Sequence, residues 1–146
     1  MHALGLALVL LLVPSLAGAQ VRWEYRVPSE ARQTGSLARA GIRESSGLAA
    51  SRAHPGVLWT IEDSGNPALV SAIDTAGRLL GRWRLRGARN VDWEAVSVGP
   101  CGEHHCIYVG DTGDNAERRR SVTIYRFREP SLTGAPGRAG AITPDR

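Results

Sequence analysis

The residues best suited to chemistry in this sequence are acidic side chains that recur beside its short apolar runs. Glu44 and Glu94 lie at the start of two such runs, and Asp63 follows the end of another. Asp111 and Asp114 follow the end of a later run of similar composition. Gathered carboxylate oxygens are the ligands that a hard cation such as calcium requires. We therefore predict a weak site for calcium or another divalent cation, formed by Glu44, Asp63, Glu94, Asp111 and Asp114.

Further polar residues are expected at the margin of this site, and the same loops have a second interpretation. D-S-G-N and D-T-G-D-N are also good turn sequences, because Asp and Asn side chains bond to nearby backbone and Gly supplies positive φ. Neither loop has the spacing of an EF-hand. Arginine is the alternative to a cation as a neutralising charge, and Arg43 and Arg89 are the candidates. The residues expected at the margin are Glu62, Asn66, Asp92 and Asn115.

Three classes of function stay open at this point. Binding of a ligand or divalent cation is the first, and it needs only the acidic residues. A metal-dependent hydrolase acting on a phosphoester or lactone is the second, with Glu44, Asp92 or Glu94 as the base. No serine lies in a G-x-S-x-G elbow. A protein-interaction scaffold, which needs no cation, is the third.

Two cysteines, Cys101 and Cys106, bracket a short segment that contains His104 and His105. In an exported protein, two cysteines on either side of a turn predict a hairpin disulfide. A zinc site with Cys and His ligands is the alternative, although structural zinc sites usually take two separated ligand pairs. The disulfide is the preferred prediction.

Short runs rich in β-formers, separated by Gly, Pro, Asn and Asp, predict an all-β fold. The run at 21–27 alternates apolar and polar residues, as a half-buried strand does. Thr75 to Gly77 is expected to form a hairpin turn. The other expected strands are 46–51, 57–62, 69–74, 79–85, 93–98, 107–111 and 122–128.

An internal repeat with a period of about fifty residues organises these strands. Glu44 and the residues after it are loosely echoed from Glu94, and VLWTIEDSGN is echoed by CIYVGDTGDN. This period, with four strands per repeat, is the size of one β-propeller blade. We therefore predict β-propeller-type four-stranded antiparallel blades, forming an incomplete propeller of about two blades, and a β-sandwich is the alternative. The expected divisions are 20–41 as an N-terminal strand and linker, 42–90 and 91–130 as blades, and 131–146 as a poorly ordered tail.

The same region resembles a known group of proteins through five motifs in order. They are E-S-S-G-L, W-T-I-E-D-S-G-N, N-V-D-W-E, Y-V-G-D-T-G-D-N and I-Y-R-F-R-E-P, and the resemblance covers roughly Ile42 to Pro130. In these the chain resembles bacterial exported β-propeller proteins of unknown function, and more distantly propellers of the gluconolactonase and phytase kinds. The resemblance implies the fold and says little about function. Ala95 departs from the pattern, because an acidic residue tends to follow D-W-E in that group.

The N-terminus predicts export. Leu4 to Val13 is apolar, and Ala17, Gly18 and Ala19 supply an A-x-A cleavage site. We expect 1–19 to be a signal peptide, the mature protein to be secreted or periplasmic, and no membrane span to remain after cleavage. The net charge is +4 and every basic residue is arginine. No aromatic residue lies among the clustered arginines, so nucleic acid is not an expected partner, and the ligand or protein partner is left unidentified.

Overall fold

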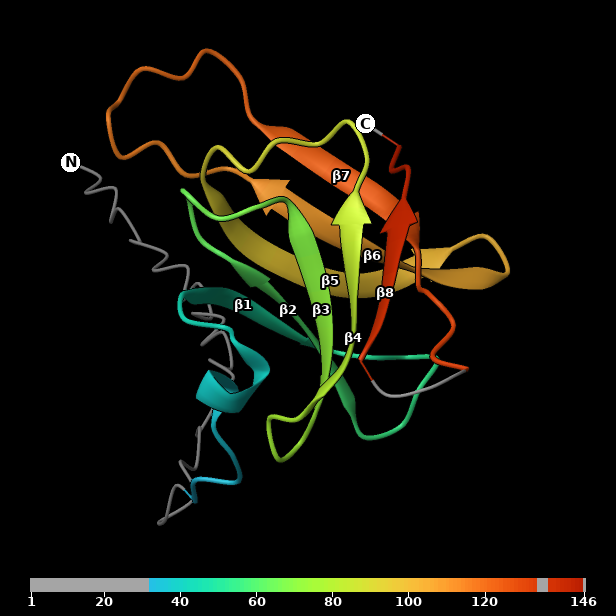
Figure 1. The fold of residues 1–146 in the computed structure, drawn as a ribbon. Coiled ribbons are helices and arrows are strands. Elements are labelled where there is room, and N and C mark those ends of the chain that lie inside the picture. The colour runs from blue at the N-terminus through green and yellow to red at the C-terminus, as the bar shows by residue number, and fades with distance from the viewer. Residues whose placement is uncertain (1–31, 134–136, 146) are drawn as a thin grey trace, which may run out of the picture. The chain divides into compact units, whose positions relative to one another are not determined.

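The computed structural model describes residues 32–133 and 137–145, which form two β-sheets (Figure 1). The first sheet has the strand order β1-β2-β3-β4-β8, and the second has the order β5-β6-β7. The described residues contain one helix, the short 3-10 helix η1 (Leu37–Ala40). The predicted all-β class is therefore confirmed. The strands are β1 (Ser45–Ala50), β2 (Val57–Glu62), β3 (Leu69–Asp74), β4 (Leu79–Leu85), β5 (Trp93–Cys101), β6 (His104–Asp111), β7 (Thr123–Arg128) and β8 (Arg138–Ile142).

Strands β1 to β7 lie where the short runs rich in β-formers predict them. Each is antiparallel to its neighbour within its sheet, and short turns connect β1 to β4 in succession. The turn between β3 and β4 closes with a hydrogen bond of 3.0 Å from the Gly77 amide to the Asp74 carbonyl, as expected for a hairpin. Strands β5 and β6 are longer than predicted, because their ladder continues to the Cys101 and His104 pair.

A shared hydrophobic core joins the two sheets. Trp59 and Trp83 of the first sheet pack edge to face, with ring centroids 5.4 Å apart. Trp93 and Tyr125 of the second sheet pack with centroids 5.9 Å apart, and Trp59 and Trp93 are completely buried. Burial of a large apolar side chain stabilises a fold by about 1.5–3 kcal/mol. These aromatic residues therefore contribute much of the stability that holds the sheets together.

Strand β5 lies against β1 and β2, so the first strands of the two repeats are neighbours. Gly47 of β1 makes this approach possible. A Cβ atom at Gly47 would lie 2.9 Å from Cγ1 of Val96 in β5, which is too close for ordinary contact. The glycine of the E-S-S-G-L motif is therefore explained by the packing of one sheet on the other.

The C-terminal segment differs from its prediction. Residues 131–146 were expected to lack regular structure, but Arg138–Ile142 forms β8, which pairs in parallel with β4. Asp145 then forms an isolated bridge with Arg126 of β7. The reason is that the edge of β4 presents backbone N–H and C=O groups that any segment can satisfy, including one rich in Gly and Ala. The composition of this segment alone therefore did not predict β8.

The expected four-stranded blade is seen in part. Strands β1 to β4 form four antiparallel strands in succession, but β8 adds a fifth, and the second sheet has three strands. Within the described residues the two sheets do not close into a ring. The predicted signal peptide (1–19) and the predicted strand at 21–27 lie outside the described residues. None of the described helical residues forms a segment long and apolar enough to cross a membrane.

Candidate cation site

The alternation of strand direction places the loops at two ends of the sheets. The β2–β3 and β6–β7 loops and the segment before β5 lie at one end, whereas the β3–β4 and β5–β6 turns lie at the other. All the acidic residues singled out in the sequence therefore belong to one end, and the Cys101 and Cys106 pair belongs to the opposite end.

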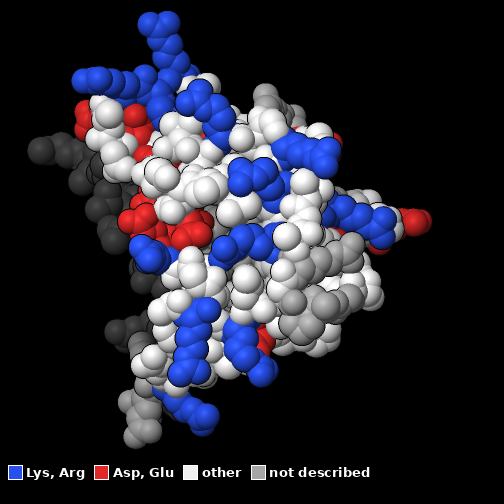
Figure 2. Space-filling view, in the orientation of Figure 1, with Lys and Arg blue, Asp and Glu red and all other residues white. Residues whose placement is uncertain are grey.

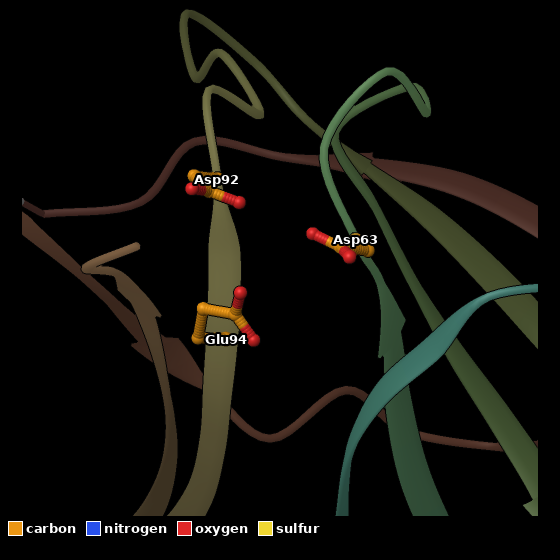
Figure 3. Close-up of side chains that lie close together, drawn as sticks. All are labelled: Asp63, Asp92 and Glu94. Atoms are coloured by element: carbon orange, nitrogen blue, oxygen red, sulfur yellow. The ribbon is translucent and has the colours of Figure 1, made fainter. Parts of the chain in front are cut away.

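Three of these acidic side chains come together. One oxygen from each of Asp63, Asp92 and Glu94 lies within 4.8 Å of the other two. Figure 3 shows Asp63 at the end of β2 and Asp92 and Glu94 along the start of β5, with their carboxylates turned toward one another. Asp63 and Glu94 were predicted as ligands, and Asp92 was expected at the margin. The cluster is therefore formed across the two sheets.

Asp92 is the buried member of this cluster. The residue is 5% exposed, while Asp63 is half-buried and Glu94 is exposed. The Oδ2 atom of Asp92 accepts hydrogen bonds from the backbone and side-chain nitrogens of Asn115, the latter at 3.1 Å. The Oδ1 atom is buried and has no hydrogen-bond partner among the described residues. A buried carboxylate oxygen without a partner is costly, so it needs an explanation.

Asn90 holds the two parts of the cluster in place. Its side-chain nitrogen donates to the backbone carbonyls of Glu62, at 2.8 Å, and of Asp63, at 2.7 Å. Its side-chain oxygen accepts from the amide of Trp93 at 3.1 Å. Asn90 therefore fastens the end of β2 to the start of β5, which brings Asp63 to Asp92. In the sequence, Asn90 stands out only as the first residue of the N-V-D-W-E motif.

The Asp92 side chain also depends on close packing by Gly113. A Cβ atom at Gly113 would lie 2.4 Å from Cγ of Asp92, so no larger residue fits there without displacement. The Gly113 amide donates to the Asp92 carbonyl at 3.0 Å. The glycine of the D-T-G-D-N loop therefore leaves room for the Asp92 carboxylate and also permits the turn.

Asp111 and Asp114, which were predicted as ligands, have other partners. Asp111 is 1% exposed, forms an ion pair of 2.7 Å with Arg119, and accepts from the Asp92 amide at 2.9 Å. Asp114 accepts from the amides of Arg118 and Arg119, and these two hydrogen bonds hold the pKa of its carboxyl below the usual value. Arg119 is therefore the arginine that neutralises Asp111. Arg43 and Arg89, the expected candidates, form no ion pair within the described residues.

Glu44, the remaining predicted ligand, lies in the equivalent place of the first repeat. Its Oε2 atom accepts from the Asn66 side chain at 2.7 Å, as Asp92 accepts from Asn115 in the second repeat. Its carbonyl accepts from the Asp63 amide at 3.0 Å. Glu44 therefore corresponds to Asp92, two residues before the Glu94 that the sequence comparison matched with it.

The opposite end carries the disulfide. Cys101 and Cys106 are bonded across the β5–β6 hairpin, with their Cα atoms 5.7 Å apart, so the predicted bridge is confirmed. Both thiols are consumed, which excludes them as zinc ligands. A cavity of about 550 Å³ lies beside this hairpin, and His54, His104 and Arg128 are among its lining residues. It contains no carboxylate of the acidic cluster.

The chemistry that this arrangement permits is coordination of a cation by oxygen atoms. Asp63, Asp92 and Glu94 supply carboxylate oxygens at one point, while Asn90 and Gly113 fix their positions. In comparisons with known proteins, no family model, no curated protein and no solved structure matches this chain.

Proposed function

We propose that this chain binds a divalent cation through Asp63, Asp92 and Glu94. The observation that carries the proposal is the buried Oδ1 atom of Asp92, which has no hydrogen-bond partner within the described residues and belongs to a group of three carboxylates. A cation bound among these oxygens satisfies that atom. It also offsets the repulsion between three negative charges held close together.

The surrounding charges support a cation more than an internal counter-ion. The described residues form three ion pairs, which join Arg78 to Asp74, Arg119 to Asp111, and Arg126 to Asp145. None of them includes a member of the cluster. The only ligand atoms offered are oxygens, which favours calcium or magnesium over zinc.

Calcium is the preferred ion because it tolerates irregular oxygen geometry and partial exposure. Three carboxylates, one of them exposed, make a site that water molecules have to complete. We therefore expect a dissociation constant on the order of 10⁻⁴ to 10⁻³ M, as in weak extracellular calcium modules.

The proposal extends to the fold and location of the protein. We infer that the two sheets are consecutive propeller-type blades, as in the exported proteins that the motifs resemble. The contact of β1 with β5 and the matching contacts of Glu44 and Asp92 support this inference. Export is supported by the A-x-A site before Gln20, and a disulfide is compatible with an oxidising compartment.

Calorimetric titration with calcium tests the cation site. The wild-type protein should bind one ion, and Asp92→Asn should abolish binding, because the buried oxygen loses its charge. Asp114→Asn is the matched control: its carboxylate accepts from the backbone amides of Arg118 and Arg119 and is not a member of the cluster, so calcium affinity should stay within about twofold.

Thermal unfolding provides a second readout that does not depend on heats of binding. Calcium at ten times its dissociation constant should stabilise the wild type by about 1.4 kcal/mol and leave Asp92→Asn unchanged. The absence of any response at several millimolar calcium would contradict the proposal. Equal responses of wild type and Asp92→Asn would contradict it as well.

A further inference from the structure

A pocket of about 340 Å³ adjoins the acidic cluster, and Asp92 contributes to its wall. This volume is suited to a small ligand. The pocket lies under the β6–β7 loop, where Figure 2 shows arginine and acidic side chains close together. Its lining residues include Asp92, Gly113, Asp114, Arg118 and Arg119.

The two arginines of this pocket have different roles. Arg119 is held by its ion pair with Asp111 and by a hydrogen bond of 2.9 Å to the Gly113 carbonyl. The guanidinium of Arg118 has no hydrogen-bond or ion-pair partner among the described residues. The Asp114 carboxylate between them is already occupied by two backbone amides. Arg118 is therefore a cation that lines a pocket without an internal counter-ion.

We propose that this pocket binds a small ligand through an oxyanion group, either a phosphate or a carboxylate, which bridges Arg118 and the cation at Asp92. The inference rests on the proposed cation site. An oxyanion supplies oxygen atoms that an incompletely coordinated calcium ion accepts, and a guanidinium binds the remaining oxygens with paired hydrogen bonds.

Because the site is negatively charged, the cation is expected to bind before the anionic ligand. Without a cation, an anionic ligand meets the carboxylates of Asp63, Asp92 and Glu94 beside the pocket, and repulsion opposes its binding. With the cation present, this repulsion is replaced by coordination. The ligand should therefore bind more tightly to the calcium-loaded protein than to the calcium-free protein.

The test uses phenyl phosphate and benzoate as soluble probes of the two oxyanion classes. Calcium binding is measured first by calorimetry, and each probe is then titrated at saturating calcium and, separately, in EDTA. At least one probe should bind in calcium and bind about tenfold more weakly or not at all in EDTA. The probe that binds more tightly identifies the class of ligand.

Arg118→Ala should weaken binding of that probe by about tenfold or more and leave calcium binding unchanged. Arg120→Ala is the matched control, because Arg120 belongs to the same loop and does not line the pocket. If calcium binds but neither probe does, the pocket proposal is wrong and the cation site stands. Equal probe affinity in calcium and EDTA, or in wild type and Arg118→Ala, also overturns it. Failure of calcium binding itself overturns the cation site.

Discussion

The indole nitrogen of Trp59 in β2 donates a hydrogen bond of 2.6 Å to the carboxylate of Glu129, which directly follows β7 in the other sheet. Glu129 is 8% exposed. It also accepts from the Ser51 hydroxyl and, at 3.1 Å, from the Ala53 amide. One buried carboxylate thus joins the β1–β2 turn, the core and the second sheet.

Replacement of this carboxylate should destabilise the whole fold. Glu129→Ala leaves the Trp59 indole N–H and the Ala53 amide without a partner, and we expect the free energy of unfolding to fall by about 3 kcal/mol. Urea unfolding followed by tryptophan fluorescence measures this. Glu103→Ala, an exposed residue of the β5–β6 turn, should change stability by less than about 0.5 kcal/mol. Equal effects of the two variants would show that the Glu129 contacts carry no net stabilisation.

Glu129 should also make stability depend on pH. Burial acts to raise the pKa of its carboxyl, but the hydrogen bonds from Ser51, Trp59 and the Ala53 amide outweigh it, so the pKa lies below the usual 4.5. A lowered folded-state pKa gives stability that is fully present above 4.5 and is lost as the pH falls through the folded-state value. The difference in unfolding free energy between wild type and Glu129→Gln should therefore narrow at acid pH. A constant difference from pH 7 to pH 2 would argue against this linkage.

The disulfide should contribute to stability and not to cation binding. Cys101→Ala with Cys106→Ala removes a bond that closes a very short loop, so we expect a loss of about 2 kcal/mol. Calcium affinity should be unchanged, because the bridge lies at the opposite end of the sheets from Asp92. Thermal unfolding and calcium titration of the same preparation measure both effects. A loss of calcium binding in a variant that stays folded would contradict the separation of the two ends.

Asn90 and Asn66 provide a matched pair of asparagines for testing the position of the ligands. Asn90→Ala removes the two hydrogen bonds that hold the end of β2 near Asp92, and we expect calcium affinity to fall about 10–100-fold. Asn66→Ala removes the hydrogen bonds of this side chain to Glu44 and to the Asp63 carbonyl, but none that reaches the start of β5, so calcium affinity should fall less than in Asn90→Ala. Circular dichroism establishes that both variants are folded. If the effects were reversed, Glu44 would be the more important ligand.

Gly113→Ala should disturb Asp92 directly. The added Cβ would lie 2.4 Å from Cγ of Asp92, so the carboxylate has to move away from its present position. We expect a destabilisation of about 1–3 kcal/mol together with loss of calcium binding. Gly99→Ala is the control, since its Cβ would lie 3.5 Å from the Tyr108 ring, an ordinary contact. Normal calcium binding by Gly113→Ala would show that the site tolerates the displacement.

The strands and the disulfide could be predicted because they depend on local pattern. The runs Val57 to Glu62 and Leu69 to Asp74 are short, apolar and bounded by turn residues, which is typical of strands, and both are buried along most of their length. Gly102 has φ of 64°, as a tight turn between Cys101 and Cys106 requires, so the two cysteines are brought together by neighbouring residues alone. The end of the sheets at which each acidic residue lies follows in the same way from strand order.

The ligand set depended on tertiary structure. Which carboxylates meet is decided by distances between loops of different sheets, and the Asn90 hydrogen bonds and the packing of Gly113 set those distances. Arg119, eight residues after Asp111, neutralises that carboxylate only because the β6–β7 loop folds back on itself. Strand β8 likewise exists because the edge of β4 offers it a backbone partner.

The internal repeat shows a difference between what sequence similarity indicates and what the tertiary structure decides. Sequence similarity aligned Glu44 with Glu94, since both precede a short apolar run. The structure has a register shift after Ser45 in β1 and after Trp93 in β5, and these matching irregularities pair Glu44 with Asp92 instead. An irregularity of this kind comes from how a strand fits its neighbour, so residue types alone do not reveal it. The sequence by itself determined which residues are acidic and which end of the sheets they occupy, and only the packing of β5 against β2 decided that Asp92 is the buried one.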